Sequence, residues 1–301
     1  MARLPNFLIV GAAKAGTTSL YYYLKEHFEI FLPERKELRF FSQMKGDFEG
    51  QGDEKLNKTI IKNIDEYIEF FKAVKIEKAI GDVSPDYLYY FENSILNIKK
   101  FLENPKVIII LRNPIDRAFS HYLHFVRDGR ETLSFEEALK EEGRRRALNW
   151  EWAWYYKDVG FYYNQVKTYL ENFLEVKVYL YDDLKKDPLN LVQDIYRFLE
   201  VDDSFIPKSI GEKFNVSGIP KNKFLHAFLT KPNLVKSAIK PLVKLFLPEK
   251  RRRNFQNKLL QKNLKKPQIK PETREYLIEL YKEDILKLQD LIKRDLSHWL
   301  R

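Results

Sequence analysis

The stretch from Phe7 to Ser19, FLIVGAAKAGTTS, constrains the fold of this chain more than any other. Phe7 to Val10 is an apolar run of the length of a buried strand, and Gly11 to Gly16 is a turn bounded by glycines. From Thr17 the pattern predicts a helix. A strand, a tight turn and a helix N-terminus direct backbone N–H groups and the positive end of the helix dipole at one point. The stretch therefore predicts an anion-binding site.

The turn has nearly the spacing of a nucleotide-triphosphate loop, G-x-x-x-x-G-K-[ST], but the lysine of that pattern is displaced. Thr17 stands at its position, and the nearby cation is Lys14, inside the turn. A second apolar run, Val107 to Leu111, predicts a buried strand and is followed by Arg112, where an NTPase would carry a magnesium-binding aspartate. These departures favour an anion site made of cations and hydroxyls, with no metal. A plain strand-to-helix turn and a P-loop kinase or NTPase are the alternatives.

Alternation of predicted strands and helices favours an α/β fold with a central parallel sheet flanked by helices. Further strands are predicted in the segments Ala79 to Pro85 and Val176 to Tyr181, and a turn is predicted to start at Asp182-Asp183-Leu184. Ser134 and Glu137, three residues on, predict a capping box at a helix start. The predicted helices are Thr17 to about His27, Asp65 to Val74, Tyr87 to Lys100 with a break near Asn93, Asp116 to Arg127, Ser134 to Glu142, Gly160 to Phe173, Pro188 to Leu199 and Pro271 to Leu300. Gly46 to Lys58 is polar and predicts a mobile surface loop. We expect one domain over residues 1–301.

Composition excludes several classes of protein. The chain has no cysteine, which excludes disulfides and thiolate metal sites, and no run of about 18 apolar residues, so no membrane-spanning helix is expected. The segment before the first strand is too short for a signal peptide, and we expect a soluble, cytoplasmic protein. Between Lys221 and Lys270 there are 15 Lys or Arg residues and one acid, Glu249. This basic part, helical from about residue 225, suits an acidic partner or is a solvated lysine-rich face.

Several ordered motifs resemble those of the PAPS-dependent sulfotransferases, in which PAPS is 3′-phosphoadenosine-5′-phosphosulfate. They are Lys14-Ala15-Gly16-Thr17-Thr18 after a strand, and Leu111-Arg112-Asn113-Pro114 with Ser120 downstream. The heparan-sulfate type and its bacterial relatives are the closer likeness, because of Lys36-Glu37-x-x-Phe40-Phe41, Asp82-x-Ser84-Pro85-x-Tyr87 and Arg294-Asp295-Leu296-Ser297-x-Trp299. The likeness spans nearly the whole chain, and it implies a P-loop-like sulfotransferase fold.

The resemblance implies a role for individual residues. The loop that holds the 5′-phosphosulfate is matched by Lys14, Ala15, Gly16, Thr17, Thr18 and Ser19. Arg112 and Ser120 match the pair that grips the 3′-phosphate, Glu37 matches the catalytic base, and Lys221 falls in a late basic loop that closes over the nucleotide. Lys14 would neutralise the bridging oxygen as the phosphate leaves. The reaction implied moves a sulfuryl group to a hydroxyl or amine, with a carbohydrate as the favoured acceptor, and releases PAP.

The sequence departs from the heparan-sulfate type at two positions on the acceptor side. Val83 stands where a lysine is usual, and Arg39 stands where one member of that type has a histidine. His121 and His124 lie three apart on one predicted helix, without further ligands at metal spacing, and we expect them to pack or face solvent. No nucleic acid partner is expected, whereas peripheral membrane contact and the oligomeric state are left open. A non-catalytic module that binds acidic polymers through residues 221–270 is the third alternative.

Overall fold

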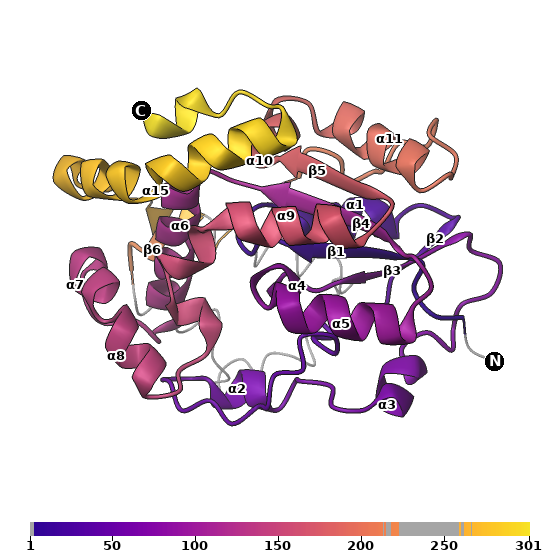
Figure 1. The fold of residues 1–301 in the computed structure, drawn as a ribbon, viewed down its shortest axis with the longest axis horizontal. Helices are drawn as coiled ribbons and strands as arrows, with labels where there is room; N and C mark the ends of the chain where they lie inside the picture. Colours follow the sequence, from indigo (N-terminus) through magenta and orange to yellow (C-terminus); the bar gives the residue numbers. More distant parts are fainter. Residues whose placement is uncertain (1–2, 213, 215–217, 223–258, 260–261, 266) are drawn as a thin grey trace.

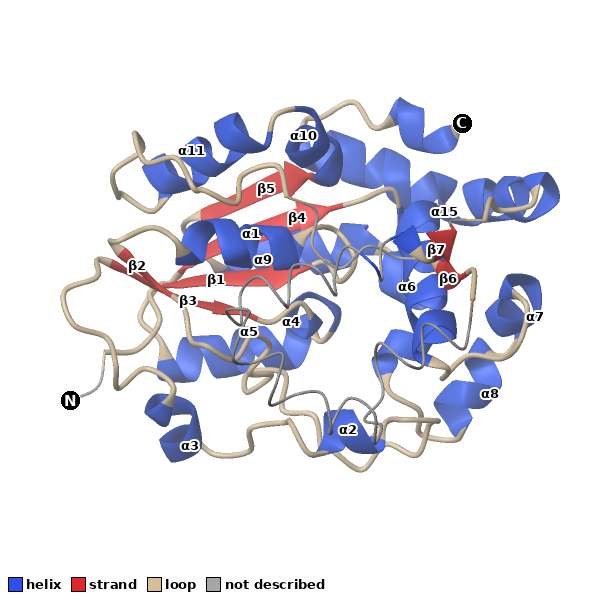
Figure 2. Ribbon diagram, turned by 180° about the vertical axis from the view of Figure 1, so that it is seen from behind, coloured by secondary structure: helices blue, strands red, loops and turns tan. Residues whose placement is uncertain are grey.

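A five-stranded parallel sheet forms the centre of the molecule, with strand order β2-β3-β1-β4-β5. The computed structural model describes residues 3–212, 214, 218–222, 259, 262–265 and 267–301. The strands are β1 (Phe7–Gly11), β2 (Ile30–Phe31), β3 (Ala79–Val83), β4 (Lys106–Leu111) and β5 (Val176–Leu180). Helices cover both faces of this sheet (Figures 1 and 2), which confirms the predicted α/β fold with a parallel sheet between helices.

Two helix layers enclose the sheet, and a further helix lies at its carboxyl edge. On one face lie α1 (Thr17–Lys25) and α11 (Pro188–Phe198), which contact each other. On the other lie α5 (Phe91–Phe101) and α9 (Tyr162–Asn172), with α15 (Pro271–Ile292) packed on α9. The carboxyl ends of the strands point toward α6 (Pro114–Asp128) (Figure 1). In parallel sheets this edge is where ligands bind.

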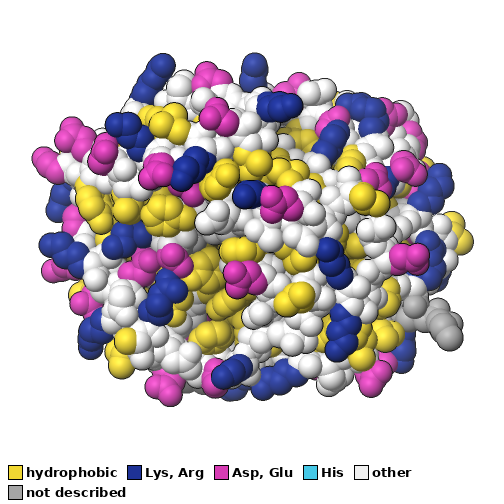
Figure 3. Space-filling view, viewed as in Figure 1, with side chains coloured by type: hydrophobic (Ala, Val, Ile, Leu, Met, Phe, Trp, Pro, Cys, Tyr) yellow, Lys and Arg dark blue, Asp and Glu magenta, His cyan; other side chains and the backbone are white. Residues whose placement is uncertain are grey.

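Shorter elements complete the described part of the chain. They are α2 (Glu54–Asn57), α3 (Ile64–Glu69), α4 (Asp86–Tyr89), α7 (Phe135–Lys140), α8 (Glu142–Ala147), α10 (Tyr181–Lys186), the 3-10 helices η1 (Trp152–Trp154), η2 (Asp158–Gly160) and η3 (Ser297–Leu300), and a separate antiparallel pair of β6 (Ile219–Pro220) and β7 (Leu264–Lys265). Apolar side chains gather in the middle of one molecular face, with charged side chains around them (Figure 3).

Sequence signals at the element ends explain where the main helices begin. Every residue of β1 is buried, because a central parallel strand is covered on both faces and can be apolar throughout. The side chain of Asn113 caps α6 by accepting from the N–H of Ile115 at 2.9 Å, and Pro114 follows at the first helical position. Ser134 and Glu137 form the predicted capping box of α7.

Several predicted boundaries are wrong. The helix break lies at Tyr90, because the Tyr90 N–H bonds to the Asp86 carbonyl and closes α4 before α5 starts. Residues 181–186 form the helix α10 where a turn was expected, and the final long helix ends at Ile292, where Lys293 adopts a left-handed conformation. The predicted helix Asp65 to Val74 is shorter, since α3 ends at Glu69.

The segment Gly46 to Lys58 is attached to the body of the molecule through a buried carboxylate, contrary to the predicted mobile surface loop. Asp53 is fully buried and accepts hydrogen bonds from the N–H of Glu151 at 2.8 Å and from Trp154 Nε1 at 2.9 Å. Arg130 pairs with the same carboxylate. A polar residue in a glycine-containing stretch gives no local sign that its partners lie about a hundred residues away.

The basic part predicted from about residue 225 lies largely outside the described residues. The single domain over residues 1–301 remains a prediction. None of the helices in the described ranges combines the length and the apolarity needed to cross a bilayer.

Gly81 lies under the ring of Phe7, its register partner on β1. A Cβ at Gly81 would lie 2.1 Å from Cζ of Phe7, which is fully buried and has no room to move. We expect Gly81→Ala to lower the free energy of unfolding by about 1–3 kcal/mol, as overpacking of a core does. Urea unfolding measures this change. Gly143→Ala is the matched control, because nothing lies within 4 Å of its added Cβ, and an equal loss in both variants would contradict the explanation.

Candidate active site

The turn of residues 12–16 joins β1 to α1 and presents the N-terminus of that helix at the carboxyl edge of the sheet. The Ala12 N–H donates to the Ile110 carbonyl at 2.7 Å, which ties the turn to β4. Gly16 is the N-cap residue, with φ of 105°, a conformation that favours glycine. The N–H groups of a helix's first turn have no acceptor within the helix, and Gly16 has no side chain that could cap them. The turn therefore has the form of a phosphate-binding site.

Lys14 lies in this turn with a left-handed backbone, φ 67°. Its carbonyl accepts a hydrogen bond from Nη1 of Arg112 at 3.0 Å, so the two predicted anion ligands are joined directly. Desolvation of the partly exposed ammonium group, together with the charges of Arg127 and Arg112, lowers the pKa of Lys14 to about 7. A lysine whose pKa is lowered in this way can take up a proton when an anion binds next to it.

Arg112 extends from the end of β4, with its guanidinium 4.9 Å from the ring centre of Tyr181. Neither of the carboxylates Asp116 and Asp82 pairs with it. Asp116 pairs with Arg274 at 2.9 Å, and Asp82 lies within a cluster of hydroxyl groups. Arg112 therefore retains guanidinium donors that can bind a phosphate in a fork.

Ser120, the second predicted 3′-phosphate ligand, is buried on α6. The start of α6 is held by a distant segment, because Asn113 Nδ2 donates to the Trp299 carbonyl at 3.1 Å. Trp299 Nε1 in turn donates to Asp182 at 3.2 Å. The C-terminal motif noted in the sequence thus supports the helix that carries Ser120.

The loop of residues 36–41, which we call the base loop, carries Glu37 and is bonded to the end of β3. Three backbone N–H groups of the loop make these bonds: Glu37 to the Val83 carbonyl at 3.1 Å, Arg39 to Ser84 Oγ at 3.3 Å, and Phe40 to Tyr87 Oη at 3.1 Å. The two motifs that the sequence showed 45 residues apart are therefore one structural unit.

Asp82 is the centre of that unit. Its carboxylate is buried and accepts from the hydroxyls of Tyr67 at 3.1 Å, Ser84 at 2.8 Å and Tyr87 at 2.7 Å. Burial raises its pKa, while the three hydrogen bonds act in the opposite direction. Asp82 is therefore a positioning residue for the base loop.

Glu37 lies between two cations. Its carboxylate pairs with Lys36 through one oxygen and with Arg39 through the other. Desolvation by burial would raise its pKa, but Lys36 and Arg39 outweigh that effect and lower the pKa to about 2. The side chain is 30% exposed, so substrate can reach it. Arg39 occupies the position where a relative has histidine, and here it is a direct partner of the carboxylate.

His124 is a site residue that sequence reasoning missed. The side chain is mostly buried on α6, and its pKa is lowered to about 3 by desolvation and by the charges of Lys14 and Arg127. His124 interacts electrostatically with both Lys14 and Glu37, which associates it with the turn and with the base loop. Its spacing of four from Ser120 placed both on one helical face, and that was the only available signal. In the described ranges no three metal-binding side chains gather into a metal site.

Lys221 lies at the end of β6, which packs against α6. Its ammonium group donates to the Lys262 carbonyl at 3.1 Å, and its N–H donates to the Asn263 carbonyl at 2.6 Å. The strand that precedes Lys221 therefore packs against the helix that carries Ser120. The assignment of Lys221 to the nucleotide remains a prediction.

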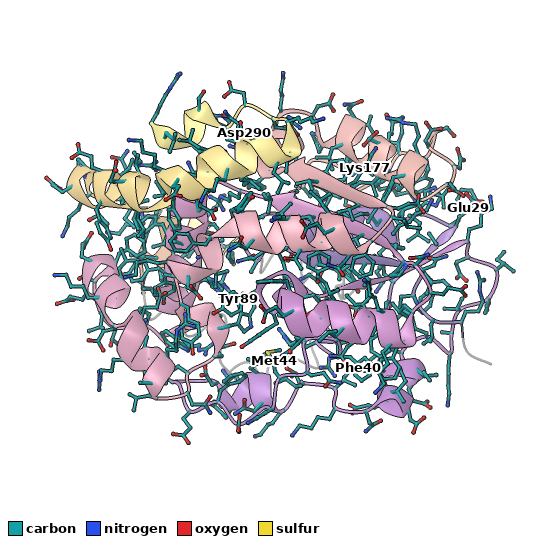
Figure 4. All side chains as sticks on the ribbon, viewed as in Figure 1. Glu29, Phe40, Met44, Tyr89, Lys177 and Asp290 are labelled. Carbon is teal, nitrogen blue, oxygen red and sulfur yellow. The ribbon has the colours of Figure 1, made fainter. Side chains whose placement is uncertain are left out.

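Aromatic side chains form the wall beside the base loop. Tyr89 is the last residue of α4 (Figure 4), and its ring stacks on that of Trp152 with the ring centres 5.6 Å apart. Tyr89 also donates to Asp158 at 2.7 Å. Trp152 and Trp154 are buried, so this tryptophan-rich run belongs to the core.

An amide-lined turn, fixed cations and a carboxylate at the edge of a parallel sheet define a class of enzymes that transfer anionic groups. Comparison with known proteins identifies the class further. A model of the "Sulfotransferase family" matches residues 5–205. A crystal structure of a sulfotransferase from Alicyclobacillus acidocaldarius is 34% identical, covers 99% of this chain and 100% of that one, and superposes with a TM-score of 0.78. The chain belongs to the sulfotransferase family, as the sequence motifs predicted.

Two further relatives match shorter parts. The membrane-associated sulfotransferase kil1 of Dictyostelium discoideum is 33% identical over 122 residues, which are 40% of this chain and 23% of the relative. The bifunctional heparan sulfate N-deacetylase/N-sulfotransferase 1 of Xenopus laevis is 27% identical over 220 residues, 66% of this chain and 22% of the relative. The match thus spans less than a quarter of either relative.

The two cations beside Glu37 account for its low pKa, so removing one should raise it. We expect Arg39→Ala to move the pKa of Glu37 from about 2 toward the ordinary 4.5, because burial then acts against less opposing charge. Carbon-13 NMR titration of labelled glutamate carboxyls, with the signal assigned by Glu37→Gln, measures this shift. Arg35→Ala is the control, since Arg35 donates to the Thr59 carbonyl and not to Glu37. A value that stays near 2 in Arg39→Ala would refute this account.

Proposed function

We propose that the protein transfers the sulfuryl group of PAPS to a hydroxyl or amine of an acceptor, with a carbohydrate as the favoured acceptor, and releases PAP. The observation that carries this proposal is the juxtaposition of Lys14 and Glu37. They belong to loops after β1 and β2, yet each loop is bonded to a neighbouring strand, and the Glu37 charge acts on the Lys14 ammonium. These observations support a cation for the leaving group and a base for the acceptor in one site.

The donor site fits a doubly phosphorylated nucleotide. The N-terminus of α1 and Lys14 suit the 5′-phosphosulfate, because amides and an ammonium group bind such anions. Arg112, with no described carboxylate partner, suits the 3′-phosphate together with Ser120. The P-loop kinase or NTPase alternative loses support, since Thr17 replaces the loop lysine and the chain belongs to the sulfotransferase family.

The proposed step is an in-line displacement at sulfur. The acceptor oxygen or nitrogen forms a bond to sulfur while the bond from sulfur to the 5′-phosphate oxygen breaks. The acceptor proton goes to the Glu37 carboxylate, and the electron pair of the broken bond stays on the phosphate oxygen, where the Lys14 ammonium stabilises it. The products are a sulfated acceptor and PAP.

The ion pairs of Glu37 set a condition on this step. A carboxylate with a pKa near 2 is a weak base, so its two cations must loosen before it accepts a proton efficiently. The sulfuryl oxygens of the donor offer Lys36 and Arg39 a competing anionic partner at the same place. Donor binding would then free the base.

A carbohydrate acceptor is supported by similarity to relatives rather than by contacts. The Xenopus laevis relative is named for heparan sulfate. The aromatic wall around Tyr89 and Trp152 suits a sugar ring, because aromatic faces stack on apolar ring faces. Incubation with sulfur-35-labelled PAPS and a panel of glycan, lipid and phenol acceptors tests the proposal. Label in a glycan supports it, label in a phenol or lipid alone corrects the acceptor, and label in none of them contradicts it.

Glu37→Gln removes the proposed base and keeps the shape of the side chain. We expect turnover to fall on the order of 100-fold or more, while the affinity for PAP is retained. Rates with labelled PAPS and calorimetric titration with PAP measure the two effects separately. Glu34→Gln is the matched control in the same segment, since Glu34 is 94% exposed and pairs with Lys25. Full turnover in Glu37→Gln would exclude Glu37 as the base.

Lys14 should bind a proton when the nucleotide binds. With a pKa of about 7 it is mostly neutral at pH 8 in the free protein, and a nearby phosphate raises that pKa. Binding at pH 8 should then take up roughly one proton per PAP, and affinity should fall as pH rises above 7. Calorimetry in buffers of different ionisation enthalpy measures the uptake. If the same uptake persists in Lys14→Met, another group is responsible.

A further inference from the structure

Arg117 is a buried cation that the mechanism above does not use. Its side chain on α6 is fully buried, and it forms no ion pair with any described Asp or Glu. Nη1 lies 3.3 Å from Nδ1 of His121, and Nη2 donates to the Tyr156 carbonyl. The remaining donor, Nε, has no hydrogen-bond partner. Two neutral acceptors therefore hold a full positive charge inside the protein.

Burying the charge of an arginine without a nearby anion lowers the stability of the folded protein. Arg145 shows the usual solution, because this equally buried arginine pairs with Glu131 at 2.7 Å. His121 does not compensate Arg117, since desolvation and the charge of Arg117 itself lower the pKa of His121 well below its ordinary value and keep the ring neutral. The missing negative charge must come from outside the described residues.

The position of Arg117 indicates where a negatively charged ligand group would bind. Residues 117 and 120 lie one turn apart on the same face of α6, so Arg117 lies directly behind Ser120. Tyr162 connects Arg117 to the other predicted ligand of the 3′-phosphate. Its hydroxyl is buried, and the Arg112 backbone and the charges of both Arg117 and Arg112 act on it. Arg117 thus lies one helical turn from Ser120 and is linked through Tyr162 to Arg112, the two groups expected to grip one phosphate.

We propose that Arg117 is an electrostatic anchor of the 3′-phosphate site, and that the 3′-phosphate of the nucleotide is its counter-ion. This inference rests on the proposed function. Arg117 acts through the field of its charge, with Arg112 and Ser120 making the direct contacts. In a desolvated site that field is weakly screened, so a fixed charge one helical turn away still attracts a dianion. The protein thereby selects nucleotides that carry a 3′-phosphate.

The test compares two nucleotides that differ only in that group, adenosine 3′,5′-bisphosphate (PAP) and adenosine 5′-monophosphate. Arg117→Gln removes the charge and keeps one amide donor for the Tyr156 carbonyl. We expect its preference for PAP over the monophosphate to fall on the order of 10-fold, with little change in the affinity for the monophosphate. Calorimetric titration of both nucleotides gives the preference.

Two further variants separate charge from structure. Arg117→Lys keeps the charge and should keep most of the preference, and it serves as the decisive variant if Arg117→Gln does not fold. Arg145→Gln removes a buried arginine that already has a carboxylate partner, and it should lose thermal stability but not the preference.

Three results would overturn the inference: an unchanged preference in Arg117→Gln, an equal loss of affinity for both nucleotides, or a lost preference in folded Arg117→Lys. Wild-type protein that binds neither nucleotide would instead refute the proposed function. The two failures are therefore distinguishable.

Discussion

The buried carboxylate of Asp82 is the interaction on which the geometry of the site depends. It gathers three hydroxyl groups at the end of β3, and two of these residues, Ser84 and Tyr87, then accept hydrogen bonds from the base loop. A loop with left-handed residues at Glu37 and Arg39 would not hold that conformation alone. The strand end supplies the constraint, and the backbone strain is compensated by bonds to a rigid sheet.

The charges of the site follow a common logic. Lys14, Arg112 and Arg117 form no ion pairs with described carboxylates, whereas burial and then the nearby cations lower the pKa of the two histidines of α6 and keep them neutral. The carboxylate of Glu37, by contrast, forms ion pairs with two cations, Lys36 and Arg39. Under the proposed function, the free protein leaves its anion-binding groups without counter-ions and keeps its base in ion pairs. The binding of a multiply charged donor would change both conditions at once.

The sequence predicted those parts of the structure that depend on local pattern. The strand, turn and helix around Lys14, the strand before Arg112 and the cap of α7 all follow from residues close together in the chain. It did not predict the burial of Asp53, whose partners Glu151 and Trp154 are remote. It also placed His124 outside the site, because only tertiary packing brings α6 against the turn.

The bond between Asn113 and Trp299 joins residues 186 positions apart. The part of the chain matched by the family model ends at residue 205, and it includes every strand of the central sheet. During synthesis on a ribosome, that sheet and α6 can assemble well before Trp299 emerges. The helix bearing Ser120 gains this hydrogen bond only then, so under the proposed function the ability to bind the donor would be acquired later than the core itself.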